Sequence, residues 1–165
     1  WKPSAARAFE DYKGKGKGGW VGFHHATLLG EFDGYPMWNW FSDFMGNIRF
    51  QNYIADFASG DVKVEDKTHP VMKGVPASFK VDKEEWYTYN KSPRPNVQVL
   101  ANVDEASYEP DSKIKMGDHP VVWVNTKVKA RNVYIFMGHS PDLLLNSNWK
   151  RMVSNAILWT AGQGN

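Results

Sequence analysis

The 165-residue chain contains no cysteine. That absence excludes disulfide bonds, thiolate metal sites and every mechanism that uses a cysteine nucleophile. It does not separate cellular compartments, because a lack of cysteine fits an extracytoplasmic address as easily as a cytoplasmic one. We favour a periplasmic or secreted location over a cytoplasmic one.

The sequence also lacks an excess of charge and long apolar runs. Its 20 Lys and Arg residues and 18 Asp and Glu residues are mixed along the chain and give a formal net charge of +2. Nucleic-acid binding normally requires an extended cationic face, so we predict no nucleic-acid partner. No apolar stretch approaches the roughly 20 residues that span a bilayer, so we predict no membrane span.

The sequence is rich in apolar and aromatic residues. With 42% hydrophobic residues, a chain of this length can form a substantial core, and we predict one domain over residues 1–165. The 8 Trp, 7 Tyr and 9 Phe residues are more than a core alone requires. Some of these rings are therefore candidates for stacking on sugars or bases, while many will be core residues.

Two short apolar runs predict buried strands that end on histidine. Residues 19–23 lead into His24 and His25, and residues 133–138 lead into His139. Such runs are typical of strands covered on both faces, as in a parallel sheet. Period-two segments predict further strands at residues 62–65, 79–82, 97–101, 120–126 and 132–137. Helical spacing of apolar residues predicts helices at residues 3–14, 36–46 and 147–161, each closed by a glycine.

The strand-end histidines are the strongest functional signal. Open α/β sheets bind ligands just past the carboxyl ends of their strands, which places His24 and His139 at one rim. A hydrogen-bonded structural role explains one such histidine equally well, but two together favour function. His25 should point to the opposite side if the strand geometry continues. His69 and His119 both precede proline, and we expect a structural role for His119.

Residues 84–87 place carboxylates beside an aromatic pair. This combination can act as acid or base next to a stacked ring, although acidic loops are usually solvated surface. A serine triad has no candidate nucleophile, because no Gly-x-Ser-x-Gly elbow is present. Glu85 could instead join His24, His69 and His139 as ligands of an open site for zinc or a similar divalent metal, without any HExxH-type spacing in support.

Several blocks, in this order along the chain, resemble the ThuA-like (trehalose utilisation) family. They are Gly18–His24, Trp38–Phe50, His69-Pro70 with Gly74, Glu85–Tyr87, Pro120–Val124, Val133–His139 and Leu158–Gly162. Each block is loose, and the set is specific. The resemblance implies a class I glutamine amidotransferase-like, flavodoxin-like fold, which is a three-layer α/β sandwich with a mostly parallel sheet.

The resemblance begins partway into the family's domain and implies further N-terminal strands ahead of Pro3. We expect such a segment, or a second copy of the chain, to cover the exposed sheet edge. In true amidotransferases of this superfamily a cysteine occupies the position near His24, and an activating histidine the position of His139. Because the chain has no cysteine, a cysteine-dependent glutaminase is excluded.

The resemblance also implies a role in carbohydrate metabolism. We predict that a sugar or an oxidised sugar derivative binds in a cleft at the carboxyl ends of the strands. The expected catalytic groups, as acids, bases or metal ligands, are His24, Glu85 and His139. The expected substrate contacts are His25, Trp38, His69 and Tyr87. The alternatives are a non-catalytic carbohydrate-binding or regulatory module and a purely structural domain in which the histidines lie apart.

Overall fold

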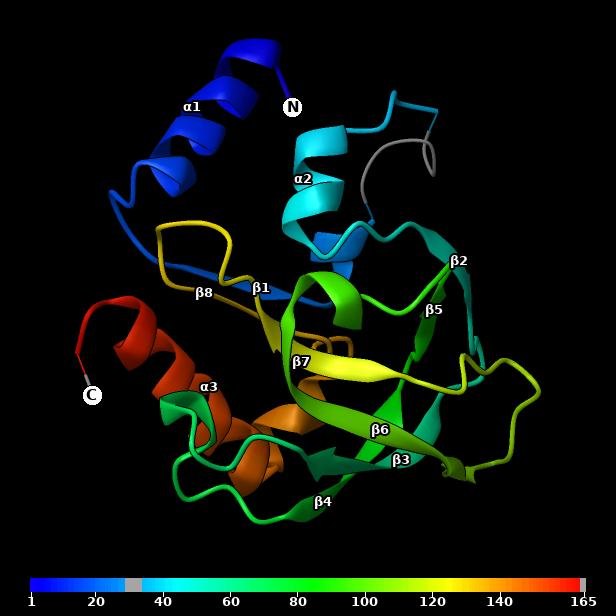
Figure 1. Cartoon of the computed structure of the whole chain (residues 1–165). Helices are drawn as coiled ribbons and strands as arrows, with labels where there is room; N and C mark the ends of the chain where they lie inside the picture. Colours follow the sequence, from blue (N-terminus) through cyan, green and yellow to red (C-terminus); the bar gives the residue numbers. More distant parts are fainter. Residues whose placement is uncertain (29–33, 164–165) are drawn as a thin grey trace.

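Eight strands are present in the computed structural model, which describes residues 1–28 and 34–163. They are β1 (Trp20–Phe23), β2 (Phe50–Tyr53), β3 (Ala58–Val64), β4 (Ser78–Glu84), β5 (Tyr87–Tyr89), β6 (Gln98–Glu109), β7 (Pro120–Val124) and β8 (Asn132–Ile135). Six of them form one curled sheet in the order β1-β8-β7-β6-β3-β4 (Figure 1). Strands β2 and β5, which the sequence did not predict as a pair, form a separate antiparallel ribbon.

The six-stranded sheet is mostly antiparallel. Only β1 and β8 pair in parallel among its described strands, and the other four pairings are antiparallel. Parallel neighbours need a long crossover connection, usually a helix, whereas β3 and β4 are joined through a single three-residue helical turn, Pro70–Met72. The prediction of a mostly parallel sheet is therefore wrong, and the flavodoxin-like arrangement is not confirmed.

The three predicted helices are present. They are α1 (Pro3–Gly14), α2 (Asn39–Phe44) and α3 (Ser147–Thr160), with short 3-10 helices at His24–Thr27, Pro70–Met72, Arg94–Asn96 and Pro141–Leu145. Helix α2 is shorter than predicted, and the chain leaves it through Gly46 at φ 104°, a value that suits glycine. The Asn146 side chain caps α3 by accepting the N–H groups of Asn148 and Trp149. Among the described helices, none has the length and hydropathy needed to cross a bilayer.

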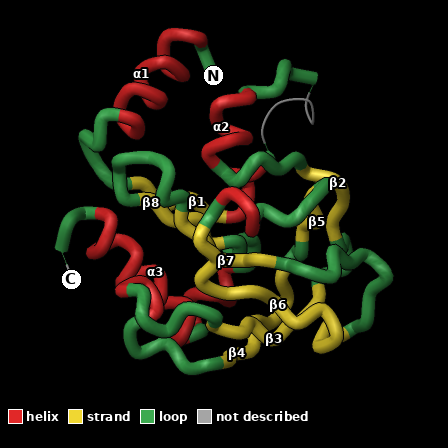
Figure 2. The backbone as a smooth tube through the Cα atoms, viewed as in Figure 1, coloured by secondary structure: helices red, strands yellow, loops and turns green. Residues whose placement is uncertain are grey.

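Helices cover both faces of β1 and β8. Trp20 and Phe23 point to opposite faces of β1, since side chains alternate along a strand. The Trp20 ring packs edge-on against Phe44 of α2 at 5.1 Å, and Phe23 contacts Trp149 of α3 at 6.3 Å. Figure 2 shows α1 and α2 on one side of these strands and α3 on the other. This double coverage accounts for the continuous apolar run of β8, which is buried throughout.

The curl of the sheet brings three strand ends to one edge. Strands β1 and β8 run in the same direction, and four antiparallel steps return β4 to that direction as well. Strands β1 and β4 are the two ends of the strand order. Nevertheless, the Glu84 carboxylate accepts the N–H group of Gly138, just beyond β8, at 2.9 Å. The carboxyl ends of β1, β4 and β8 therefore meet at one edge, which we call the rim.

Candidate functional site

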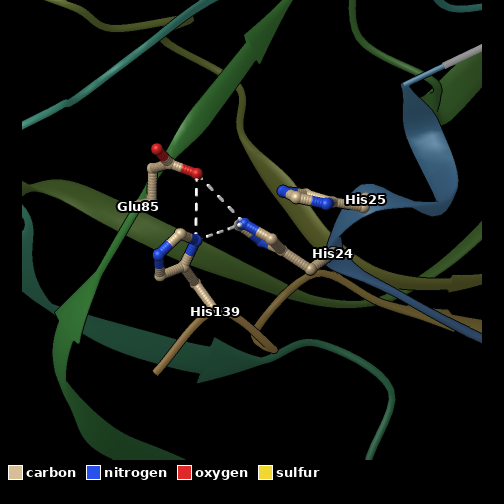
Figure 3. A group of neighbouring side chains, drawn as sticks. All are labelled: His24, His25, Glu85 and His139. Atoms are coloured by element: carbon tan, nitrogen blue, oxygen red, sulfur yellow. Dashed lines mark hydrogen bonds and ion pairs between the residues drawn. The ribbon is translucent and has the colours of Figure 1, made fainter. Parts of the chain in front are cut away.

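Three side chains from distant parts of the chain converge at the rim. His24 Nε2 lies 3.2 Å from Glu85 Oε2 and 3.2 Å from His139 Nδ1, and the His139 and Glu85 atoms are 3.1 Å apart (Figure 3). His25 completes the group, because one ligand atom from each of the four residues lies within 4.8 Å of the others. We call these four residues the rim cluster. It contains all three residues that the sequence predicted as catalytic groups.

The backbone turns sharply at the end of β1. His24 has φ 36°, in the left-handed region that non-glycine residues rarely adopt, and it begins the 3-10 helix His24–Thr27. Strand geometry therefore stops at Phe23, and His25 does not point to the opposite side. Its ring lies 5.0 Å from that of His24 in a stacked arrangement. The condition under which His25 would point away is therefore not met, and His25 lies beside His24.

A group of buried hydroxyls holds this turn in place. Tyr134 donates a hydrogen bond to the His24 carbonyl at 2.8 Å, and Thr27 donates to the same carbonyl at 3.2 Å. The Tyr89 hydroxyl lies 3.0 Å from Thr27 Oγ1 and 3.2 Å from the Tyr134 hydroxyl. Burial raises the pKa of both tyrosines, so they remain hydroxyl donors. Position-specific hydroxyls such as these gave no signal in the sequence.

Glu84 positions the two other strand ends. Its carboxylate accepts the N–H groups of Glu85 and Gly138, each at 2.9 Å, and lies 3.5 Å from the N–H group of His139. Burial raises the pKa of Glu84, and these backbone hydrogen bonds counter the shift only in part. The sequence favoured the neighbouring Glu85 and missed this role. Glu84 thus fixes the backbone on both sides of the rim cluster.

A bulge in β4 explains why Glu84 faces inward. Ala58 of β3 pairs with Glu84 and Gly60 pairs with Val81, so β4 contains one residue more than its partner. Lys83 takes up the extra length at φ 52° and stays exposed. Strict alternation from the buried Val81 would instead have turned Lys83 inward. A carboxylate therefore replaces an amine beneath the rim cluster.

The protonation pattern of His24 follows from its surroundings. His24 Nδ1 lies 3.2 Å from the Phe136 carbonyl and donates a hydrogen bond to it. Burial lowers the pKa of His24 to about 4, against a hydrogen bond to Glu85 that raises it, and the neighbouring His25 and His139 lower it further. The ring is therefore neutral near pH 7, and its Nε2 lone pair points at Glu85 and His139.

Aromatic rings surround the rim cluster. The ring of Tyr87, a predicted substrate contact, lies 4.4 Å from the His24 ring. Phe57 lies 4.9 Å from the His139 ring, and Tyr53 packs edge-on against Tyr87 at 6.5 Å. Phe57 and Tyr53 are 38% and 39% exposed, so both residues are partly accessible to a ligand. Neither residue is predictable from the sequence, because residues 50–57 carry no pattern that marks them as part of a site.

The comparisons with known proteins agree with the resemblance. A family model described as ThuA, trehalose utilisation, matches residues 1–160. The chain belongs to the ThuA family. None of the curated proteins compared with it is similar.

Two solved ThuA-like structures are similar to this chain. A ThuA-like protein from Bacteroides uniformis shares 32% sequence identity and a TM-score of 0.85, over 99% of this chain and 66% of that one. A ThuA-like protein from Parabacteroides merdae shares 17% identity and a TM-score of 0.72, over 100% of this chain and 68% of that one. The second supports the fold alone. The chain spans just under two thirds of the length of the first.

Two predicted substrate contacts of this ThuA-family chain do not reach the rim. Trp38 packs 5.9 Å from Phe9 between α1 and α2, and its indole N–H donates to Glu10 at 2.7 Å. His69 lies near the opposite edge of the sheet, where its ring meets Trp159 at 4.7 Å and its Nδ1 accepts the N–H group of Val71. Trp38 is held by the aromatic layer over β1, and His69 follows β3, which runs away from the rim.

Proposed function

We propose that this chain processes a sugar or an oxidised sugar derivative at the rim. The observation that carries the proposal is the convergence of His24, Glu85 and His139 within 3.2 Å of one another at a partly exposed edge. Groups at such distances can take a proton from a hydroxyl group, or from a carbon next to a carbonyl, and return it elsewhere. The family description, trehalose utilisation, supports a carbohydrate as the substrate.

The aromatic surroundings support the same substrate class. The partly exposed residues Phe57 and Tyr53 lie beside His139 and Tyr87. Sugar rings present apolar C–H faces that stack on aromatic side chains, while their hydroxyls need polar partners. The rim offers both within one neighbourhood. A sugar stacked on Phe57 would bring its hydroxyl or carbonyl oxygens toward His139, because the two rings are 4.9 Å apart.

The experiment is a conversion assay with tag-free protein. Trehalose, glucose and their keto and acid derivatives are incubated with the chain, and new species are followed by NMR. We expect turnover of at least one of them, reduced at least about 100-fold in His139→Ala and Glu85→Gln. Glu109→Gln is the matched control, because Glu109 is exposed and forms an ion pair with Lys80 at another place on the surface.

Two results would overturn the proposal. If wild-type protein binds a sugar in calorimetry and never converts it, the chain is a carbohydrate-binding or regulatory module. If Glu109→Gln loses as much activity as Glu85→Gln while both remain folded, the rim cluster is not the reaction centre. Circular dichroism of every variant keeps loss of folding separate from loss of function.

A further inference from the structure

We propose that the rim cluster is a binding site for one divalent transition-metal ion, with His24, His25, Glu85 and His139 as its protein ligands. For the role of the ion this inference rests on the proposed function, but the binding itself is measurable without any substrate. The set differs from the one that the sequence suggested, because His25 takes the place of His69.

Hydrogen-bond accounting favours a cation at this place. His24 Nδ1 donates to the Phe136 carbonyl, so Nε2 of the neutral ring carries a lone pair. That lone pair faces Glu85 Oε2, which is also an acceptor, and His139 Nδ1. If His139 Nδ1 carries a hydrogen, it can donate that hydrogen well to only one of the two other atoms, His24 Nε2 or Glu85 Oε2. These two atoms are both acceptors and would still face each other at 3.2 Å. One cation between the three atoms satisfies every lone pair at once.

The distances within the cluster match those around a small metal ion. Zinc binds imidazole nitrogen and carboxylate oxygen at about 2.0–2.2 Å, so neighbouring ligand atoms are about 3.3 Å apart at tetrahedral angles and about 2.9 Å apart at right angles. The three separations among His24, Glu85 and His139 are 3.1–3.2 Å. His25 lies somewhat farther away, within the 4.8 Å span of the group, and its exposed side chain can move in as a fourth ligand.

The surrounding residues hold the ligands as they do in metal sites. A histidine that binds a metal nearly always donates its other N–H group to a carbonyl or carboxylate, and His24 does so to Phe136. Tyr134 fixes the carbonyl of His24, and Glu84 fixes the backbone of Glu85 and Gly138, beside His139. The three segments that carry His24, Glu85 and His139 are therefore oriented before any ion binds.

The donor set defines the class of metal. Three imidazoles and one carboxylate suit zinc and neighbouring first-row ions, whereas magnesium and calcium prefer sites made entirely of oxygen. His25 and His139 are exposed, which leaves one side of the cluster open to a substrate oxygen. When bound, such an ion acts as a Lewis acid and polarises a carbonyl or hydroxyl oxygen. An oxidised sugar offers both kinds of oxygen.

Calorimetric titration of tag-free, chelator-stripped protein with Zn²⁺ tests the inference. We expect one Zn²⁺ per chain, no comparable binding of Mg²⁺, and affinity reduced at least about tenfold in His139→Ala and in Glu85→Gln. These two positions are chosen because their side chains are less buried than that of His24. His69→Gln is the control that separates the two candidate ligand sets, and it should bind Zn²⁺ as wild type does.

Three outcomes would overturn the inference. They are a stoichiometry other than 1:1, wild-type affinity in the folded double variant His139→Ala/Glu85→Gln, and loss of affinity in His69→Gln. Activity after chelation then separates the two proposals. Sugar turnover that survives complete removal of metal rejects the role of the ion in the reaction and keeps the proposed function, while the titration alone decides whether the metal site exists. Tight 1:1 binding of Zn²⁺ without turnover of any sugar rejects the proposed function and keeps the metal site.

Discussion

A histidine lies against a glutamate in two regions of the molecule. The two regions differ in whether the acceptor atoms of these side chains face other acceptors or face hydrogen-bond donors. At the rim, three atoms of His24, Glu85 and His139 that can each act as an acceptor converge on one point. In the interior, His119 Nδ1 lies 2.9 Å from Glu105 Oε1, and His119 is only 1% exposed. The residue types are the same, but only the rim presents several ligand atoms to a place that solvent can reach.

Hydrogen bonds satisfy the glutamate of the interior pair, whereas His119 Nε2 is buried without a hydrogen-bond partner among the described residues. Glu105 accepts the N–H groups of Met116 and Gly117 as well as a hydrogen bond from His119, so donors face its carboxylate on every contact. Tyr108 adds a hydroxyl 3.1 Å from His119 Nδ1. This agrees with the structural role expected for His119 from the sequence. The comparison shows that convergence of acceptors, rather than the presence of histidine and glutamate, distinguishes a candidate site from a structural pair.

The largest expected effect separates the two glutamates. Glu85→Gln should reduce sugar turnover by about 10²–10⁴-fold and change the free energy of unfolding by less than about 1 kcal/mol. Glu105→Gln should have the opposite effects: it should lower the free energy of unfolding and leave the sugar turnover per folded molecule unchanged. Urea denaturation and the NMR conversion assay measure the two quantities. Equal loss of turnover in both variants would show that the regions do not differ in function.

The next effect concerns the stability of the interior. His119→Leu should lower the free energy of unfolding by about 2–4 kcal/mol, because Glu105 stays buried while it loses its imidazole partner. Zinc stoichiometry should remain one per chain, since His119 lies outside the rim cluster. Urea denaturation gives the first value and calorimetry the second. A loss below about 0.5 kcal/mol would show that the interior pair contributes little to the fold.

A smaller effect compares two buried tyrosine hydroxyls. Tyr134→Phe removes the hydrogen bond to the His24 carbonyl and should cost about 1 kcal/mol of stability together with a severalfold weaker affinity for Zn²⁺. Tyr108→Phe makes the same chemical change beside His119 and should cost a similar amount of stability with no change in that affinity. If both variants bind Zn²⁺ equally well, Tyr134 does not position the rim cluster.

The smallest effect is a difference in acid sensitivity. Burial tends to raise the pKa of Glu105, but hydrogen bonds from His119 and from two backbone N–H groups outweigh it, so the pKa lies below the ordinary value of a glutamate. A lowered folded-state pKa gives stability that is present above the unfolded pKa and is lost as the pH falls through the folded one. Glu105→Gln should therefore show a flatter dependence of unfolding free energy on pH below about 4.5. An unchanged slope in a pH series of urea denaturation would contradict this assignment.

The sequence predicted the parts of the site that depend on local pattern. The runs that form β1 and β8 are apolar and end on His24 and His139, so their convergence at one rim followed from strand direction. Proline and glycine positions predicted the helices for similar local reasons. Glu85 was also predicted, because residues 84–87 place carboxylates beside an aromatic pair.

Features that depend on long-range geometry could not be predicted. The mostly antiparallel order and the curl of the sheet arise from pairings between segments far apart in the chain. The left-handed turn at His24 and the bulge at Lys83 each redirect a side chain against simple alternation, and neither residue type announces such a backbone. Trp38 and His69 were predicted as substrate contacts but lie away from the rim. Residue type alone does not reveal which edge of a sheet a residue reaches.

The hydrogen bonds of Glu84 have one further consequence. They join residue 84 to residue 138, which are 54 positions apart, and each of these residues is the immediate neighbour of a member of the rim cluster. Forming this contact restricts the chain between the two residues. The resulting loss of conformational entropy occurs during folding and not during ligand binding. Glu85 and His139 are therefore preorganised by the same event that completes the tertiary structure. A ligand that binds at the rim therefore does not have to order the backbone of these two residues.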